Sequence, residues 1–247
     1  MIEFRNVNKR YDTGTEAVHN ANFKIDKGEF AFLVGSSGSG KSTLINLIPR
    51  FYDVTSGNLL IDGVDIKDIA NKDLRKIVGF VPQKGILFSG TIESNIKYGN
   101  PEMSDEQMIE AAEIAQATEF IEGKDKKYNS EIAQGGGNVS GGQKQRLSIA
   151  RAIAKNPEIF VFDDSFSALD FKTDKTLREA LSEKTKDKTV IIVAQRISTI
   201  LNADQIIVLE EGKVVGKGTH EELMKTSEVY KQIALSQLSE KELGGEA

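Results

Sequence analysis

The sequence predicts an α/β fold with a mainly parallel sheet, because short apolar stretches alternate with longer helical patterns along the chain. Residues 30–34, 159–162 and 189–194 are almost continuously apolar, as buried parallel strands are. Residues 2–7 and 21–25 instead alternate apolar and polar side chains, which is the pattern of half-buried strands. We therefore expect a parallel core with antiparallel strands at its N-terminal end.

The other elements are predicted from the same patterns. Strands are expected at residues 57–61 and 77–81, a hairpin at 206–215, and helices at 43–48, 104–120, 143–155 and 221–238. Ser104 and Gln107 form a capping-box pattern at the start of one helix, and Asn156 with Pro157 ends another. Residues 134–138 are expected to form a loop, and residues 244–247 a frayed tail.

Composition excludes several classes of protein. The 247 residues suffice for one large α/β domain, or for a core with a small inserted subdomain. The 39% of hydrophobic and 28% of charged residues exclude wholesale disorder. The apolar runs are too short to span a bilayer, and the first residues lack the layout of a signal peptide. We therefore expect a cytoplasmic protein without a membrane helix.

The scarcity of Cys and His limits the chemistry further. The chain has no Cys and two His, His19 and His220. This excludes disulfides, thiolate nucleophiles and Cys-based metal sites, and leaves little for a His-ligated metal. We expect both His at the surface and assign them no role. The net charge of −5 argues against a general nucleic-acid-binding protein, so no nucleic-acid partner is expected.

A glycine-rich loop carries the first functional motif. Residues 35–42 read GSSGSGKS, which fits the phosphate-loop pattern G-x-x-x-x-G-K-[ST], and they lie between a predicted buried strand and a predicted helix. The glycines let backbone N–H groups turn inward around phosphates, and the helix N-terminus adds partial positive charge. Lys41 should reach the β- and γ-phosphates, and the Ser42 hydroxyl should bind Mg²⁺. A flexible Ser/Gly linker is the alternative, but its position between strand and helix disfavours it.

A second glycine cluster and a pair of carboxylates follow. Residues 139–146 read VSGGQKQR and open a predicted helix, so they can present backbone donors and the Ser140 hydroxyl to an anion. The predicted strand at residues 159–162 ends in Asp163 and Asp164, as a Mg²⁺-binding strand end should.

In this order and spacing, these motifs resemble those of the nucleotide-binding domain of ATP-binding-cassette (ABC) transporters, and the resemblance covers nearly the whole chain. Residues 35–42 look like the Walker A loop. Residues 139–143 look like the signature segment, with Val139 in place of the usual Leu. Asp163 looks like the Walker B magnesium ligand, and Gln83 like the Q-loop residue that links Mg²⁺ to the membrane partner.

Further positions match the same family. Tyr11 is at the place of the aromatic residue that stacks on adenine, although such a residue alone is more often a packed turn aromatic. Residues 167–170 look like the D-loop, and residues 135–137 like the segment that touches the partner subunit. The nucleotide-binding residues that the resemblance implies are Tyr11, Gly35, Ser36, Ser37, Gly38, Ser39, Gly40, Lys41, Ser42, Thr43, Gln83, Ser140, Gly141, Gly142 and Gln143. The implied metal ligands are Ser42, Gln83 and Asp163.

The resemblance also implies a fold and a mode of action. It implies a P-loop NTPase with a RecA-like core and an antiparallel β subdomain (residues 1–83 and 156–247), and an inserted helical subdomain (residues 84–155). Such a domain binds Mg-ATP and dimerises head to tail, so that the signature of one subunit caps the ATP of the other. The implied partners are a second ABC domain, in a homodimer or heterodimer, and a transmembrane subunit through which the domain associates with the membrane. Coupling of ATP binding and hydrolysis to export is the implied function.

Two departures from the family pattern concern hydrolysis. Asp164 stands where a Glu normally orients the attacking water, and Gln195 stands where a switch His is normal. A carboxylate set back by about 1.3–1.5 Å can miss the water, since a misplacement of ~1 Å can cost around a hundredfold in rate. Gln can hydrogen-bond the γ-phosphate but carries no proton or charge. Together the two departures resemble the degenerate half of heterodimeric bacterial exporters. The implied catalytic residues are Lys41, Asp164 and Gln195, and the resemblance predicts that they hydrolyse ATP slowly.

Alternatives stay open at this point. Each departure could be a tolerated variant, or the chain could be a regulatory half with little catalysis. Residues 81–92 and 219–223 resemble exporters, whereas residues 1–17 resemble the start of the stand-alone ABC ATPase of bacterial cell division. The second resemblance keeps a nucleotide-binding interaction module outside transport as an alternative. It also raises the hypothesis of a chimera of two ABC domains, with a seam near residues 44–49.

Overall fold

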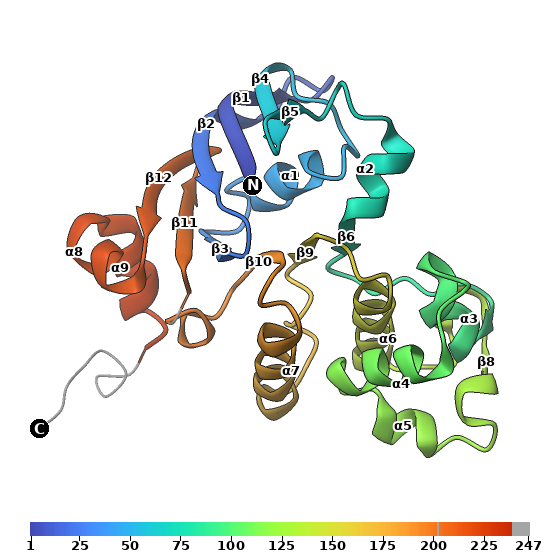
Figure 1. Ribbon diagram of the computed structural model, residues 1–247. Helices are drawn as coiled ribbons and strands as arrows, with labels where there is room; N and C mark the ends of the chain where they lie inside the picture. The colour runs from blue at the N-terminus through green and yellow to red at the C-terminus, as the bar shows by residue number, and fades with distance from the viewer. Residues whose placement is uncertain (202, 239–247) are drawn as a thin grey trace, which may run out of the picture. The chain divides into compact units, whose positions relative to one another are not determined.

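The computed structural model describes residues 1–201 and 203–238, so the predicted tail at residues 244–247 lies outside it. The chain forms two compact units (Figure 1). The first unit comprises Met1–Val78 and Asp187–Ala247, and the second comprises Gly79–Lys186. Within the described ranges, no helix combines the length and the apolar character that crossing a membrane requires.

The first unit contains an antiparallel sheet. Its strands are β1 (Ile2–Arg10), β2 (Glu16–Ile25), β4 (Ser56–Ile61) and β5 (Val64–Asp65), in the order β2-β1-β4-β5. Alternate side chains such as Ile2 and Phe4 are buried, and Phe4 stacks on Phe23 of β2 with ring centroids 4.3 Å apart. The predicted antiparallel N-terminal strands are therefore confirmed, and β1 and β2 are longer than expected.

The same unit contains parallel strands. These are β3 (Phe30–Val34), β10 (Thr189–Val193) and β11 (Gln205–Glu210), with β12 (Lys213–Gly218) antiparallel to β11 as predicted for the hairpin. β3 lies in the middle and pairs in parallel with both β10 and β11. Almost every residue of these three strands is buried, which agrees with their continuous apolar sequence.

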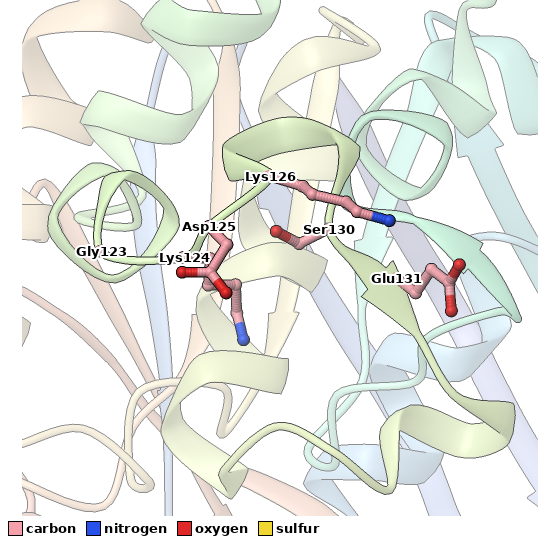
Figure 2. A pocket seen from close by; sticks show the side chains of 6 residues that line it. All are labelled: Gly123, Lys124, Asp125, Lys126, Ser130 and Glu131. Carbon is pink, nitrogen blue, oxygen red and sulfur yellow. The ribbon is translucent and has the colours of Figure 1, made fainter.

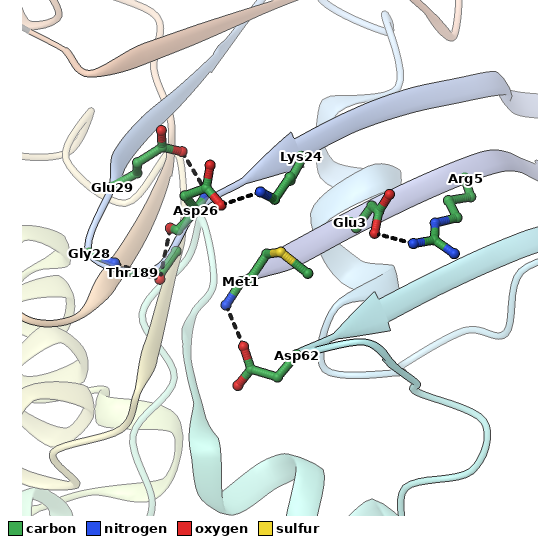
Figure 3. A network of polar contacts seen from close by, with 9 residues as sticks. All are labelled: Met1, Glu3, Arg5, Lys24, Asp26, Gly28, Glu29, Asp62 and Thr189. Atoms are coloured by element: carbon green, nitrogen blue, oxygen red, sulfur yellow. Dashed lines mark hydrogen bonds and ion pairs between the residues drawn. The ribbon is translucent and has the colours of Figure 1, made fainter.

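A network of hydrogen bonds and an ion pair stabilises the turn between β2 and β3 and connects it to β10 (Figure 3). The Thr189 hydroxyl, at the start of β10, donates to the Asp26 carbonyl and accepts from the Gly28 amide, each at 3.3 Å. The Asp26 carboxylate pairs with Lys24 at 2.5 Å, and the Asp26 amide donates to Glu29 at 2.6 Å. These contacts fix where β3 begins, and β3 in turn leads into the glycine-rich loop.

Short helices complete the first unit: α1 (Lys41–Leu47), α2 (Asn71–Ile77), the 3-10 turn η4 (Ile197–Thr199), α8 (His220–Thr226) and α9 (Glu228–Leu235). The single helix predicted at residues 221–238 is wrong, since α8 and α9 are separate. Ser227 between them has an extended backbone, and its hydroxyl accepts from the Tyr230 amide as the N-cap of α9. Ser competes well for such a cap, which ends one helix and starts the next.

The second unit is mostly helical. Its helices are α3 (Ile92–Ile96), α4 (Asp105–Ile114), α5 (Thr118–Glu122), α6 (Gly141–Ala154) and α7 (Phe171–Lys184), with 3-10 turns η1 (Lys97–Gly99), η2 (Lys127–Asn129) and η3 (Gln134–Gly136). β6 (Val78–Val81) pairs with β9 (Ile159–Asp163), and β7 (Gly90–Thr91) pairs with β8 (Glu131–Ile132). Figure 1 shows α3 to α6 gathered together.

The helix predicted at residues 104–120 is also two helices. Its start is confirmed, because Ser104 and Gln107 form the predicted capping box. It ends early because Gln116 has a φ of 55°, a left-handed conformation that an α-helix cannot contain. α5 then begins at Thr118.

Candidate functional site

The phosphate loop connects β3 to α1 through three glycines with positive φ. These are Gly35 (φ 150°), Gly38 (φ 79°) and Gly40 (φ 97°). A Cβ on Gly35 would lie 2.2 Å from the Leu209 carbonyl oxygen, and one on Gly40 would lie 2.3 Å from that of Ala17. Backbone of β11 and β2 therefore presses against the loop at two points where only glycine fits.

The ammonium group of Lys41 crosses this loop. It donates to the Gly35 carbonyl at 2.8 Å, to the Ser36 carbonyl at 2.6 Å and to the Ser39 hydroxyl at 3.1 Å. The next side chain, Ser42, is exposed. The predicted phosphate-binding cation is thus held over the loop that would surround the phosphates.

Tyr11 lies beside the helix that follows the loop. Its hydroxyl is 3.1 Å from the Thr43 hydroxyl, which brings together two residues that the sequence analysis predicted to bind nucleotide. The Tyr11 and Tyr52 rings are nearly perpendicular, with centroids 5.5 Å apart, and the Lys9 ammonium lies 5.3 and 5.5 Å from the centres of these two rings. Lys9 and Tyr52 were not predicted from the sequence, since neither belongs to a motif. Stacking of Tyr11 on adenine stays a prediction.

Gln195 belongs to the same edge of the parallel sheet as the phosphate loop. Val193 of β10 pairs with Leu33 of β3, and the Ala194 amide donates to the Leu33 carbonyl at 3.0 Å. Both strands end there, one before Gln195 and the other before Gly35. Gln195 itself is exposed, which is compatible with the predicted contact to a nucleotide.

The carboxylates at the end of β9 lie in the second unit. Asp163 and Asp164 are 8% and 6% exposed, and Asp164 has a left-handed φ of 47° that Asp tolerates better than most residues. Its Oδ2 accepts a hydrogen bond from Gln83 Nε2 at 3.0 Å. The structure therefore brings together the predicted water-orienting residue and the predicted Q-loop residue.

The signature segment forms the N-terminus of α6, which begins two residues earlier than predicted. Ser140 is the N-cap: its hydroxyl accepts from the Gln143 amide at 3.2 Å, and Gln143 Oε1 accepts from the Ser140 amide at 3.1 Å. Gly141 is exposed, and a Cβ built on it would have no neighbour within 4 Å. The segment thus offers an open backbone surface on a capped helix end.

The D-loop segment lies against the signature. A Cβ on Gly142 would be 3.4 Å from the Ala168 carbonyl oxygen. Asp170 is the N-cap of α7, because it accepts from the Thr173 amide at 3.0 Å and from the Thr173 hydroxyl at 2.7 Å. These hydrogen bonds stabilise the carboxylate and lower the pKa of Asp170.

Two buried polar residues near Gln83 are missing from the sequence predictions. Gln145 of α6 donates to the Pro82 carbonyl at 3.0 Å, and the Ser165 hydroxyl donates to the Val81 carbonyl at 2.9 Å. One signal could have found Gln145. It shares the helical spacing of Ile149 and Ala152, so a polar side chain stands on the buried face of the helix.

The predicted magnesium ligands are of residue types that suit an ion bound together with phosphates. Among residues 1–201 and 203–238, no three His, Cys, Asp or Glu side chains gather as an independent metal site. Mg²⁺ on a nucleotide is usually held by one or two protein carboxylates, because water and phosphate oxygens supply most of the other ligands. Asp163 in the second unit is such a carboxylate. The amide of Gln83 and, in the first unit, the hydroxyl of Ser42 are further oxygen donors, and their binding to one ion stays a prediction.

A surface hollow of about 450 Å³ lies elsewhere in the second unit (Figure 2). It is lined by Gly123, Lys124, Asp125, Lys126, Ser130 and Glu131. The lining charges are of both signs, and no predicted site residue is among them.

Comparison with known proteins assigns the family. The ABC transporter family profile matches residues 18–167, a range that includes the phosphate loop, Gln83, the signature and both carboxylates. The chain therefore belongs to the ABC transporter family. It is an ATP-binding domain of ABC type, with the P-loop NTPase fold and the ATPase class that the sequence predicted.

The individual relatives are bacterial proteins whose names refer to export. The chain is 47% identical over 233 residues to YgaD of Bacillus subtilis (strain 168) and to SAB1799c of Staphylococcus aureus (strain bovine RF122 / ET3-1), both named as candidate multidrug export ATP-binding/permease proteins. Each alignment covers 94% of this chain and 40% of the relative.

A solved structure of a bacterial Atm1-family ABC exporter with ATP bound matches with a TM-score of 0.92 and 37% identity, over 97% of this chain and 42% of that one. The chain thus spans about two fifths of the length of these exporters. The predicted resemblance to ABC exporters is confirmed.

Proposed function

We propose that this domain binds Mg-ATP and pairs head to tail with a second ABC domain, which is either another copy of the chain or a related one. ATP binding and hydrolysis in that pair drive export through a transmembrane part, and the domain lies on the cytoplasmic side of the membrane. The names of the bacterial relatives, which join an ATP-binding and a permease function, support the coupling to export.

The phosphate loop is the observation that carries the proposal. Its glycines have positive φ, a conformation that allows backbone N–H groups to turn toward phosphates, and Lys41 is held across the loop by two loop carbonyls. In phosphoryl transfer, catalysis consists mostly of positioning and of stabilising charge. Lys41 and the loop amides supply that stabilisation at the β- and γ-phosphates.

The magnesium ion adds to this charge stabilisation when it is bound with ATP. Ser42, Asp163 and Gln83 are the residues that would hold it. Asp163 is the carboxylate among them, so its charge contributes most to the attraction of the cation. Gln83 contributes an uncharged amide. By its resemblance to the Q-loop residue of the family, it would also link the magnesium ion to the membrane partner.

We further propose that hydrolysis is slow. Asp164 is one methylene shorter than the Glu that normally orients water, and one of its carboxylate oxygens already accepts from Gln83. Gln195 can hydrogen-bond a phosphate, but it cannot take up a proton. Tight binding with slow turnover suits a domain whose signature serves the competent site of its partner.

Sedimentation velocity with and without Mg-ATP, combined with a turnover assay, tests the proposal. We expect saturating Mg-ATP to convert the chain from monomer to dimer while little phosphate is released. Lys41→Ala is the control and should stay monomeric, because it lacks the phosphate-binding cation. A wild-type chain that stays monomeric both alone and mixed with a hydrolysis-competent exporter domain would contradict the proposal.

A further inference from the structure

Gln145 is a buried residue of α6, the helix that begins with the signature segment. It is 1% exposed, and its Nε2 donates to the carbonyl of Pro82, the residue before Gln83, at 3.0 Å. A buried amide is costly unless it is hydrogen-bonded. The hydrogen bond to the Pro82 carbonyl therefore offsets the cost of burying this amide.

The backbone around Gln83 is fixed at two more points. On one side the fully buried Ser165 hydroxyl donates to the Val81 carbonyl at 2.9 Å. On the other side Gly85 lies so close to α6 that a Cβ on it would be 2.7 Å from the carbonyl carbon and oxygen of Lys144. Residues 81–85 are therefore held between the turn after β9 and the first turns of α6.

This support matters because Gln83 itself is exposed. An exposed side chain has few packing contacts that could fix its position, and ordering it costs conformational entropy. The place of its amide, which donates to Asp164 Oδ2 at 3.0 Å, is then set mainly by the backbone to which it is attached. That backbone is what Gln145 holds.

We propose that Gln145 is a positioning residue that ties residues 81–85 to the signature helix and thereby holds Gln83 in place for the magnesium ion. The inference rests on the proposed function, in which Gln83 is a ligand of nucleotide-bound Mg²⁺. It adds a mechanical link: a shift of α6, which carries the signature, is transmitted through the amide of Gln145 to Gln83.

The test measures ATP affinity twice for each variant, once with Mg²⁺ and once with EDTA. Gln145→Met keeps the length of the side chain but removes the donor. We expect its affinity in EDTA to equal that of the wild type, because the phosphate loop is untouched. Its gain in affinity on adding Mg²⁺ should fall about fivefold, as for the loss of one buried hydrogen bond.

Ser148→Ala is the matched control. Ser148 lies on the same helix, is also buried, and its hydroxyl is 3.5 Å from the Ile86 carbonyl, which is beyond Gln83 and too long for a strong bond. This variant should keep the full effect of Mg²⁺. Gln83→Ala should reproduce the loss, and the double variant with Gln145→Met should lose no more than Gln83→Ala alone, because both act through one group.

Gly85→Ala provides a second route if Gln145→Met folds poorly. It pushes the same backbone away from α6 and should also reduce the Mg²⁺ effect with unchanged affinity in EDTA. The proposal is overturned if folded Gln145→Met keeps the full Mg²⁺ effect while Gln83→Ala loses it. If Gln145→Met does not fold, Gly85→Ala takes its place, and a full Mg²⁺ effect in that variant overturns the proposal. If Mg²⁺ does not affect ATP binding by the wild type, or Gln83→Ala has no effect, the assigned role of Gln83 fails and this inference fails with it.

Discussion

Gly40 marks where the phosphate loop leaves no room for a side chain. Its φ is 97°, and an added Cβ would lie 2.3 Å from the Ala17 carbonyl oxygen. We expect Gly40→Ala to lower the free energy of unfolding by about 2–4 kcal/mol, from left-handed strain plus overpacking. Urea denaturation measures this loss.

Gly63→Ala is the control for that prediction. Gly63 has a similar φ of 81°, but a Cβ on it would have no neighbour within 4 Å, so only the strain of about 1–2 kcal/mol applies. Equal losses of unfolding free energy in the two variants would show that the backbone at Ala17 moves at little cost. The close contact would then not determine the conformation of the loop.

The half-buried His220 of α8 pairs with the fully buried Tyr230 of α9, whereas the sequence predicted a surface His with no role. His220 Nδ1 is 2.8 Å from the Tyr230 hydroxyl. Burial lowers the pKa of His220, partly opposed by Glu221, and raises the pKa of Tyr230 to about 12. Both shifts favour the neutral side chains in the folded protein.

The lowered pKa of His220 predicts a loss of stability in acid. As pH falls below the ordinary His pKa of about 6.5, the unfolded chain takes up a proton that the folded chain resists, so the free energy of unfolding decreases. Urea melts at pH 7.5 and 5.5 measure the decrease. His220→Gln should make it smaller than in the wild type, and an unchanged decrease would exclude His220 as a cause.

At the scale of elements, two helices of the second unit begin with the same capping box but differ in expected function. Ser104 caps α4 and Ser140 caps α6. Either Ser→Ala change should cost about 1 kcal/mol of stability. Only Ser140→Ala should also weaken ATP-dependent dimerisation, because only that cap belongs to the signature.

Thermal melting and sedimentation separate these two effects. Ser104→Ala serves as the control for stability, since it removes the same type of hydrogen bond within the same unit. Equal dimerisation by the two variants at equal stability would mean that the Ser140 hydroxyl acts only as a helix cap.

Strands were easier to predict than helices for physical reasons. β3, β9 and β10 are buried and nearly continuous in apolar residues, so composition alone identifies them. α7 was not predicted, because its polar sequence buries few apolar side chains, among them Leu177 and Leu181. The division of the helix at residues 104–120 depends on the backbone of Gln116, and an unbroken apolar pattern does not reveal it.

At the scale of the whole molecule, the candidate site divides into parts that sequence could and could not predict. The phosphate loop, the signature and the strand-end carboxylates are each read from consecutive residues. Gln145 and Ser165 act on backbone 63 and 84 positions away, so no local pattern contains them. A sequence motif thus identifies groups that would meet the ligand, whereas the contacts that hold those groups require the fold.

In the proposed function, the domain is one subunit of an ATP-binding dimer that drives export. Its phosphate loop serves its own nucleotide, and its signature serves that of the partner. Under the proposed function, the departures at Asp164 and Gln195 would weaken the first role and leave the second intact.

Steady-state ATP turnover by the purified chain, beside the double variant Asp164→Glu, Gln195→His, tests this account most directly. The account predicts slow turnover by the wild type and an increase of about tenfold or more in the double variant, since a carboxylate displaced by ~1 Å can cost around a hundredfold. Nucleotide affinity should be similar in the two proteins. Equal and rapid turnover by both would contradict the account.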